Sequence, residues 1–369
     1  MSVTTAPAPP ATPAQQDSAP LRLTNGRLPR WAPWVILGVS AAAVALLFGV
    51  VALAGEAEFN VAGWAIVSAL VYLALITTIS TVVEGHRKGV DRLVTGIVTV
   101  AFLIAMVPLV SVAITVVTNG IAGISAEFFT HSMRNVVGEG GGALHAIVGT
   151  LLITLAAAAI SIPIGLFTAI YLIEYGAGKR LARGITFLVD VMTGIPSIVA
   201  GLFAFALFAL FFGPGVRMGI MGSVALSVLM IPVVVRSTEE MLRLVPNELR
   251  EAAYALGVPK WLTIVKVVLP TSIAGITTGI MLSISRVIGE TAPLLITAGM
   301  ATSMNYNLFE GRMASLPVFV YTQYMNQGIP GWAYLDRAWA GALVLIVIVM
   351  VLNLLARVIA RIFAPKMGR

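Results

Sequence analysis

Long apolar stretches recur along this chain, and short segments that carry most of the charged residues separate them. A helix that crosses a membrane needs about 20 consecutive, predominantly apolar residues. Windows of this length predict spans at residues 34–54, 61–83, 93–118, 144–173, 185–212, 219–236, 270–298 and 340–363. The pattern therefore predicts an all-α, polytopic membrane protein with about eight transmembrane helices embedded in a lipid bilayer.

The first 30 residues differ from the rest of the chain, because they are rich in Ala, Pro, Thr and Gln. Such a composition cannot bury an apolar core, so we expect a disordered tail at residues 1–30. The apolar segment that follows ends in Ala52-Leu53-Ala54, which is similar to a signal-peptide cleavage site. Its apolar run exceeds the roughly 7–15 residues of a signal peptide, so we expect residues 34–54 to remain as an uncleaved span.

The composition places most of the chain in lipid or against other apolar helices. Hydrophobic residues make up 59% and charged residues 11%, with a mean hydropathy of +0.97, whereas soluble domains carry about 25% charged residues. Cysteine is absent, which excludes disulfides, thiolate metal sites and a cysteine nucleophile. His86, His131 and His145 are scattered without the spacing of metal ligands. We therefore expect neither a metal site nor a catalytic residue.

The basic residues are distributed very unevenly between the two sides of the predicted membrane. With the amino terminus placed in the cytoplasm, 18 of the 23 lysines and arginines fall in cytoplasmic segments, four fall outside, and Arg286 lies within a span. This asymmetry follows the positive-inside rule and predicts that both termini are cytoplasmic. The net charge of +7 is thereby explained by topology, and nucleic acid is not expected as a partner.

One cytoplasmic connection, residues 237–269, is much longer than the others and is rich in good helix formers. Asn247 can cap a helix that starts at Glu248, and Gly257 can end it with a positive φ. Pro259 can then start a second helix. These signals predict two short helices that meet at a corner, which is either a plug for a groove on another protein or a solvated link.

Two charged residues, Arg286 and Glu290, are the only ones between Thr271 and Met300. A charged side chain at the centre of a bilayer costs about 2.5–3.5 kcal/mol on insertion scales, and such residues mark substrate pathways by default. At positions i and i+4 of one helix they could instead form a neutral ion pair that locks helices together. The pair has no net charge, so by itself it does not specify an anion.

Other polar or helix-breaking positions favour structural roles or leave two interpretations open. Asp190, near the cytoplasmic end of its predicted span, favours a structural or gating role. Gly194, Pro196 and Gly201 predict either a kink that lines a path or ordinary close packing. The external segment 302–337 carries aromatic residues that form either an interfacial belt or a docking face for an external binding protein. These residues are Tyr306, Phe309, Phe319, Tyr321, Tyr324, Trp332 and Tyr334.

The residues also bear on three other function classes: an ATP-binding protein, a membrane-embedded enzyme and a secondary transporter. The stretch Gly176 to Arg180 lacks the first Gly and the Ser or Thr of a phosphate-binding loop, so the chain has no ATP site of its own. No clustered set of His, Asp and Glu and no nucleophile motif supports a membrane-embedded enzyme. A secondary transporter would not need the rigid cytoplasmic corner that residues 237–269 predict.

The stretch "EAAYALGVPKWLTIVKVVLP" resembles the EAA loop of ABC importer permeases, here residues 237–270. The matching positions are Glu251, Ala252, Ala253, Gly257, Leu269 and Pro270, with Val267 where Ile is usual. The resemblance implies that this loop docks into a cleft of an ATPase subunit and transmits its closure to the permease.

Three further stretches, "RVIGETAPLL", "TGIPSIVAGLF" and "MASLPVFVY", are similar to the A-type permeases of phosphate importers. Thr291-Ala292-Pro293 distinguishes this subfamily from its C-type partner, in which Met commonly follows Gly-Glu-Thr. The resemblance covers about residues 93–369, which it implies form a permease core of the type I ABC importers with six helices. Residues 31–92 depart from the pattern and are expected to form two accessory transmembrane helices.

The resemblance also implies an assembly in the plasma membrane of a bacterium. Its expected partners are a homologous second permease, an ATPase dimer that binds ATP, and a periplasmic or lipid-anchored phosphate-binding protein. Inorganic phosphate is the implied substrate, with Arg286, Glu290 and Thr291 on its path and no cofactor of the chain's own. A permease for another oxyanion, sulfate or molybdate, is the nearest alternative, and a secondary transporter is a more distant one.

Overall fold

The computed structural model describes residues 26–55 and 60–363. The predicted tail at residues 1–30 therefore lies largely outside the described residues. Within the described ranges the regular structure is helical, without a strand. Seven of these helices are long and apolar enough to cross a membrane, and one sharply bent pair brings the number to eight. This confirms the predicted all-α, polytopic fold. The chain divides into two compact units, Met1–Ser111 and Val112–Arg369.

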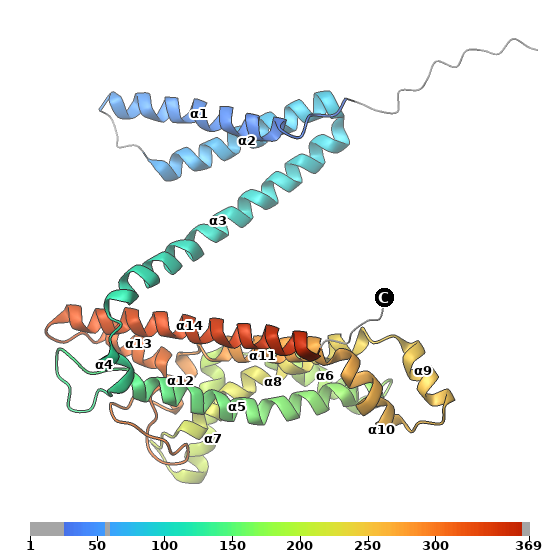
Figure 1. Cartoon of the computed structure of the whole chain (residues 1–369), viewed down its shortest axis with the longest axis vertical. Helices are drawn as coiled ribbons and strands as arrows, with labels where there is room; N and C mark the ends of the chain where they lie inside the picture. Colours follow the sequence, from blue (N-terminus) through green and yellow to red (C-terminus); the bar gives the residue numbers. More distant parts are fainter. Residues whose placement is uncertain (1–25, 56–59, 364–369) are drawn as a thin grey trace, which may run out of the picture. The chain divides into compact units, whose positions relative to one another are not determined.

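The first unit contains a helical hairpin, α1 (Ala32–Leu53) and α2 (Val61–Glu84), whose helices lie side by side (Figure 1). The indole Nε1 of Trp64 on α2 donates to the carbonyl oxygen of Ala41 on α1 at 2.9 Å. Both helices agree closely with the first two predicted spans. Two apolar helices, each long enough to span a membrane, therefore pack against each other as a hairpin.

The long helix α3 (His86–Ala122) follows directly after α2 and begins earlier than the predicted start at residue 93. Gly85, with φ +96°, ends α2 and separates the two helices. The carboxylate of Glu84 spans this break, because its Oε2 accepts hydrogen bonds from Ser80 Oγ at 2.8 Å and Arg92 Nε at 2.7 Å. Three polar side chains thus share one set of hydrogen bonds at the end of the hairpin.

The centre of the second unit is a pair of helices, α5 (Leu144–Ile170) and α8 (Gly219–Arg243), which lie side by side (Figure 1). A π-helical turn, η1 (Tyr171–Tyr175), extends α5 at its carboxyl end. Ser223 of α8 donates its hydroxyl to the carbonyl oxygen of Ile153 on α5 at 3.1 Å. Fully buried side chains from several helices surround this pair, among them Ile153, Leu226, Met230, Val287 and Leu294.

The expected span at residues 185–212 consists of two helices rather than one. α6 (Arg180–Thr193) and α7 (Ser197–Phe212) meet at an angle of 110°. Pro196 lacks a backbone N–H and disfavours the helical conformation at the residue before it, which favours a break here, although α5 and α8 continue through Pro163 and Pro232. α6 accordingly ends with Gly194 as its C-cap, and the chain turns sharply.

The expected span at residues 270–298 is likewise broken. Its first part is α11 (Leu269–Val287), which ends before Glu290. A short helix, α12 (Ala292–Thr297), follows. Pro293 explains the break, because in a continuous helix its ring would clash with the carbonyl group of Gly289 and remove one hydrogen bond.

The remaining elements complete the second unit. They are α4 (Ala126–Thr130), α9 (Asn247–Ala255), α10 (Lys260–Thr263), the π-helical η2 (Ile264–Val268), α13 (Leu316–Met325) and α14 (Gly331–Phe363). α7 packs against α12, and a Cβ atom on Gly201 would lie 2.7 Å from the Cα of Pro293. Close packing therefore explains this glycine, one of the two interpretations left open by the sequence.

Candidate functional site

Arg286 lies in the last turn of α11, on a face of the helix that the rest of the described chain leaves exposed. Exposed positions on this face recur at helical spacing, at Thr271, Thr278, Leu282, Arg286 and, just past the helix, Gly289; Pro270 and Ile273 are exposed elsewhere on α11. A different face of α11 is buried by Ser272, Ile276, Gly279, Ser283 and Val287. The helix therefore presents a stripe that ends in one guanidinium group.

Glu290 and Thr291 lie beyond the end of α11, in the break that precedes α12. The backbone N–H of Glu290 donates to the carbonyl oxygen of Val287 at 3.1 Å, and the Thr291 carbonyl accepts from the N–H of Leu295 at 2.9 Å. The expectation that Arg286 and Glu290 occupy successive turns of one helix is therefore wrong. Among the ion pairs of the described chain, none joins these two residues.

The break changes what this segment can do chemically. A locked Arg–Glu pair would neutralise the guanidinium and use part of its N–H donors, whereas an exposed guanidinium has its whole planar set of donors available. Such a fork matches the oxygen atoms of a carboxylate or an oxyanion. Arg286, Glu290 and Thr291 therefore lie close together in the chain at one helix break, and Arg286 lies on the exposed face of α11.

The predicted corner between two short helices is present in the structure, at α9 and α10. α9 ends before Gly257, whose φ of +74° places it in the left-handed region, and its N–H donates to the carbonyl oxygen of Tyr254 at 2.9 Å. Pro259 then stands at the N-cap of α10, as predicted. The predicted cap at Asn247 is wrong, because α9 begins at Asn247 itself with Pro246 at the N-cap.

A buried ion pair anchors this corner to the end of α5. Arg250 of α9 donates to Oε1 of Glu174 from Nη2 at 2.9 Å and from Nε at 3.1 Å. The same guanidinium donates to the carbonyl oxygens of Val245 at 2.7 Å and Leu242 at 3.0 Å. Lys260 donates to the backbone carbonyl oxygen of Glu174. Four acceptors therefore hold α9 and α10 against the membrane helices.

The six residues of the EAA pattern occupy different environments within this corner. Glu251 and Ala252 are exposed on α9, whereas Ala253 is buried. Leu269 and Pro270 form the beginning of α11 rather than a docking surface. Large apolar side chains that stand out from the corner were not singled out from the sequence. They are Leu244, Leu256 and Trp261, of which Leu256 is 84% exposed.

A second charged cluster joins α6 to α8. Arg236 donates to Glu239 Oε2 at 2.6 Å from Nη1 and to Asp190 from Nη2. Asp190 thereby fulfils a structural role of the kind expected from its position. The predicted span at residues 219–236 ends at Arg236, whereas α8 extends seven residues further, to Arg243.

At the opposite end of the second unit, Arg337 is buried and donates hydrogen bonds to three other residues. α14 begins at Gly331, not near residue 340, so Arg337 belongs to this helix. Its Nε donates to Gln323 at 3.0 Å, and its Nη1 donates to the carbonyl oxygens of Gly138 and Gly140, both at 2.8 Å. The long-range partners of this residue leave no signal in a single sequence.

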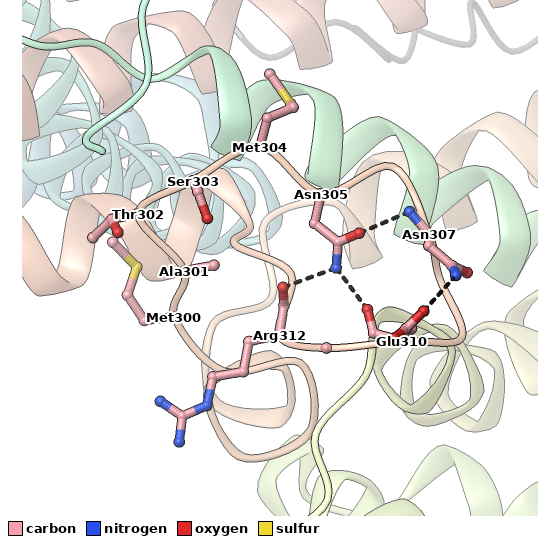
Figure 2. A pocket seen from close by; sticks show the side chains of 10 residues that line it. Met300, Ala301, Thr302, Ser303, Met304, Asn305, Asn307, Glu310 and Arg312 are labelled. Carbon is pink, nitrogen blue, oxygen red and sulfur yellow. Dashed lines mark hydrogen bonds between the residues drawn. The ribbon is translucent and has the colours of Figure 1, made fainter. Parts of the chain in front are cut away.

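The segment between α12 and α13 forms an open surface pocket of about 580 Å³, lined by residues 300–305, 307 and 310–312. Figure 2 shows its polar network, in which Asn305 Nδ2 donates to the carbonyl oxygens of Glu310 at 2.8 Å and Arg312 at 3.1 Å. The aromatic residues of the predicted external segment differ in exposure. Tyr306 and Phe309 are exposed, and Phe319 is buried.

Comparisons with known proteins agree with this architecture. Residues 161–369 match the family described as "Binding-protein-dependent transport system inner membrane component". The phosphate transport system permease protein PstA of Mycobacterium leprae is 49% identical over 69% of this chain and 83% of that protein. The PstA protein of Yersinia pestis is 39% identical over 77% of this chain and 93% of that protein.

Among solved structures, a chain of a bacterial alginate ABC transporter in complex with an alginate pentasaccharide-bound periplasmic protein matches with a TM-score of 0.53. It is 14% identical over 76% of this chain and 97% of that chain, and the likeness shows the fold. The identities to the curated proteins over most of their length are much higher. The chain therefore belongs to the binding-protein-dependent transport system inner membrane components and, among them, to the family of the PstA phosphate transport permeases.

Proposed function

We propose that this chain is a permease subunit of an ATP-driven importer of inorganic phosphate in the bacterial plasma membrane, with both termini in the cytoplasm. Its family membership supports the importer class, and the names of its curated relatives support phosphate as the substrate. The single observation that carries a role in translocation is the exposed Arg286 on a helix long and apolar enough to cross a membrane.

Arg286 cannot face the lipid cheaply. It lies sixteen residues beyond Pro270, about 24 Å along a helix of 1.5 Å rise per residue, in the last turn of the candidate span Lys260–Val287. A cation exposed to hydrocarbon costs up to about 2.5–3.5 kcal/mol on insertion scales unless a polar surface meets it. We infer that a homologous second permease covers the exposed stripe of α11, and that the substrate path runs between the two subunits.

The chemistry of the helix break suits an oxyanion. The guanidinium of Arg286 would bind two phosphate oxygens at once. Glu290 and Thr291 lie next in the chain and would orient the guanidinium or donate a hydrogen bond from the threonine hydroxyl. Because α11 continues from η2 and α10, movement of the cytoplasmic corner would reach this break through one helical segment.

The corner itself is the proposed contact with the ATPase dimer, which would bind the ATP. The exposed apolar side chains Leu256 and Trp261 stand out from a scaffold that Glu174 and Arg250 fix to α5. An anchored helical element with protruding apolar groups is suited to a groove on another protein. An extracytoplasmic phosphate-binding protein would deliver the substrate on the opposite side.

Uptake by the assembled complex tests this function. The chain is co-expressed with the neighbouring permease and ATPase subunits, reconstituted in vesicles and supplied with the phosphate-loaded binding protein and ATP. We expect ATP-dependent uptake of radiolabelled phosphate that excess sulfate or molybdate does not inhibit. Uptake that follows sulfate or molybdate would establish the alternative oxyanion permease, and uptake without the ATPase would favour a secondary transporter.

A further inference from the structure

Two arginine side chains from different parts of the chain converge beside Gly299. Arg217 precedes α8, and Arg312 lies in the segment that leads to α13. A Cβ atom on Gly299 would lie 3.1 Å from Cδ and 3.4 Å from Nη1 of Arg217, and 3.5 Å from Cδ of Arg312. The two guanidinium groups therefore extend from one small region at the end of α12.

The backbone around this region is held in place. Gly299 is buried, has a φ of +73°, and donates its N–H to the carbonyl oxygen of Leu294 at 2.9 Å. The N–H of Met313, next to Arg312, donates to the carbonyl oxygen of Ala298 at 3.2 Å. The convergence of the two arginines is thus set by hydrogen-bonded backbone.

No carboxylate of the described chain forms an ion pair with either arginine. The nearest acid in sequence to Arg312 is Glu310, whose Oε2 instead accepts from Asn307 Nδ2 at 3.4 Å. Figure 2 shows the side chain of Arg312 extending away from this network of Asn305, Asn307 and Glu310. The two arginine side chains therefore pass the same point beside Gly299, and neither forms an ion pair among the residues that the structure describes.

A third source of positive potential lies beside them. α8 contains 25 residues and begins at Gly219, two positions after Arg217, so the positive end of its helix dipole adds to the same field. Like charges in proximity repel one another, and an anion that bridges them removes this repulsion while accepting several charge-assisted hydrogen bonds. Arg217 is half-buried and Arg312 is exposed, so the pair remains accessible from solvent.

We propose that Arg217 and Arg312 form a second oxyanion site, at the extracytoplasmic mouth of the path, which receives inorganic phosphate before it reaches Arg286. This inference rests on the proposed function for its ligand and its orientation. The six residues of α12 join the two sites, because they follow Glu290 and Thr291 and lead to Gly299. These six residues correspond to about 9 Å along a helix.

Residue-resolved chemical footprinting tests the site without requiring transport. The intact permease complex in lipid nanodiscs is treated with phenylglyoxal, which modifies accessible arginines, with and without inorganic phosphate and at constant ionic strength. We expect phosphate to protect Arg217 and Arg312 from modification in the absence of the binding protein. The exposed Arg134 serves as the internal control and should react equally in both conditions.

Two results would overturn the proposal. Equal modification of the pair with and without phosphate would show that no anion site exists there. Protection that requires the binding protein and is independent of phosphate would show that the pair contacts an acidic surface of that protein instead. Either result leaves ATP-dependent phosphate uptake by the wild-type complex unaffected, so failure of this inference is distinguishable from failure of the proposed function.

Uptake by variants provides a second measurement. In Arg217→Gln/Arg312→Gln we expect the initial rate at low concentrations of phosphate-loaded binding protein to fall about fivefold, as for exposed charges. Arg217→Lys/Arg312→Lys, which keeps both charges, should regain part of the rate, and Arg134→Gln should match the wild type. An unchanged rate in the double Gln variant at normal expression would contradict a role in substrate capture.

Discussion

Glu174 accepts two hydrogen bonds on a single carboxylate oxygen from Arg250, at 2.9 and 3.1 Å, and this contact joins the end of α5 to α9. Only 5% of the glutamate side chain and 12% of the arginine side chain are exposed. The pair therefore connects the corner proposed to meet the ATPase with the helix pair at the centre of the second unit.

Replacement of Arg250 by Ala should destabilise this corner. Removing one partner of a buried ion pair costs about 3–5 kcal/mol, because the remaining charge is left without compensation. We expect a lower thermal unfolding midpoint in detergent and loss of phosphate-stimulated ATP hydrolysis by the complex. Glu248→Gln, which alters an exposed charge on the same helix, is the matched control and should behave as the wild type. Normal stimulation in Arg250→Ala would show that the contact does not couple the two parts.

Gly257→Val should disturb coupling through backbone conformation alone. The residue has φ +74°, and a Cβ atom there would meet no other atom within 4 Å, so no steric clash is involved. A left-handed conformation costs about 1–2 kcal/mol for a residue with a side chain, and more for a β-branched one. We expect normal insertion with lost ATPase association in a pull-down assay. Gly257→Asn should retain more association, because Asn tolerates this conformation.

The sequence predicted the existence of the spans well, because apolar length is a local property. Two predicted spans are each divided into two helices, and a proline, Pro196 or Pro293, lies close to each break. A window that sums apolar residues counts length and does not test whether a helix can continue through a residue without an N–H. Proline alone does not locate such breaks, because α3, α5 and α8 continue through Pro108, Pro163 and Pro232.

The contacts that position the site could not be found in this way. Arg250 and Glu174 lie 76 positions apart, and Arg337 lies 199 positions from the carbonyl group of Gly138. Such pairings depend on how the helices pack. In a single sequence, a charged residue at a helix end has many possible hydrogen-bond or ion-pair partners, and nothing local distinguishes them. The corner at Gly257 and Pro259 was predictable because its signals are confined to a few consecutive residues.

Removal of the first two helices tests whether residues 31–92 are accessory. A chain that begins near Val83 keeps Arg87, Lys88 and Arg92 to orient α3 by the positive-inside rule. It also keeps the hydrogen bond between Arg92 and Glu84 at 2.7 Å. We expect this shortened chain to assemble and transport phosphate, measured as uptake per amount of inserted protein. Absence of uptake despite normal insertion and assembly would place the hairpin in the core of the transporter.

Substitution of Arg286 provides the decisive measurement on the path. Arg286→Gln removes the cation and should lower phosphate uptake at least tenfold, because a charge-assisted bidentate contact is worth about 1.5–3 kcal/mol. Arg286→Lys keeps the charge but loses the fork, so it should restore only part of the rate. Leu282→Ala, one turn earlier on the same exposed face, tests the apolar part of the inferred subunit contact; a smaller loss of uptake than in Arg286→Gln would show that the guanidinium, and not the packing of the stripe, carries the effect.

The double variant Arg286→Leu/Glu290→Leu separates a substrate contact from scaffolding. An ion-pair lock would tolerate this change, since replacing both members of such a pair by apolar residues is often neutral or stabilising. The structure has no such pair between the two residues, and α11 ends before Glu290. We therefore expect the double variant to assemble with the ATPase and yet fail to take up phosphate. Uptake at the wild-type rate, with equal expression, would reduce Arg286 and Glu290 to structural residues and move the path elsewhere on the stripe.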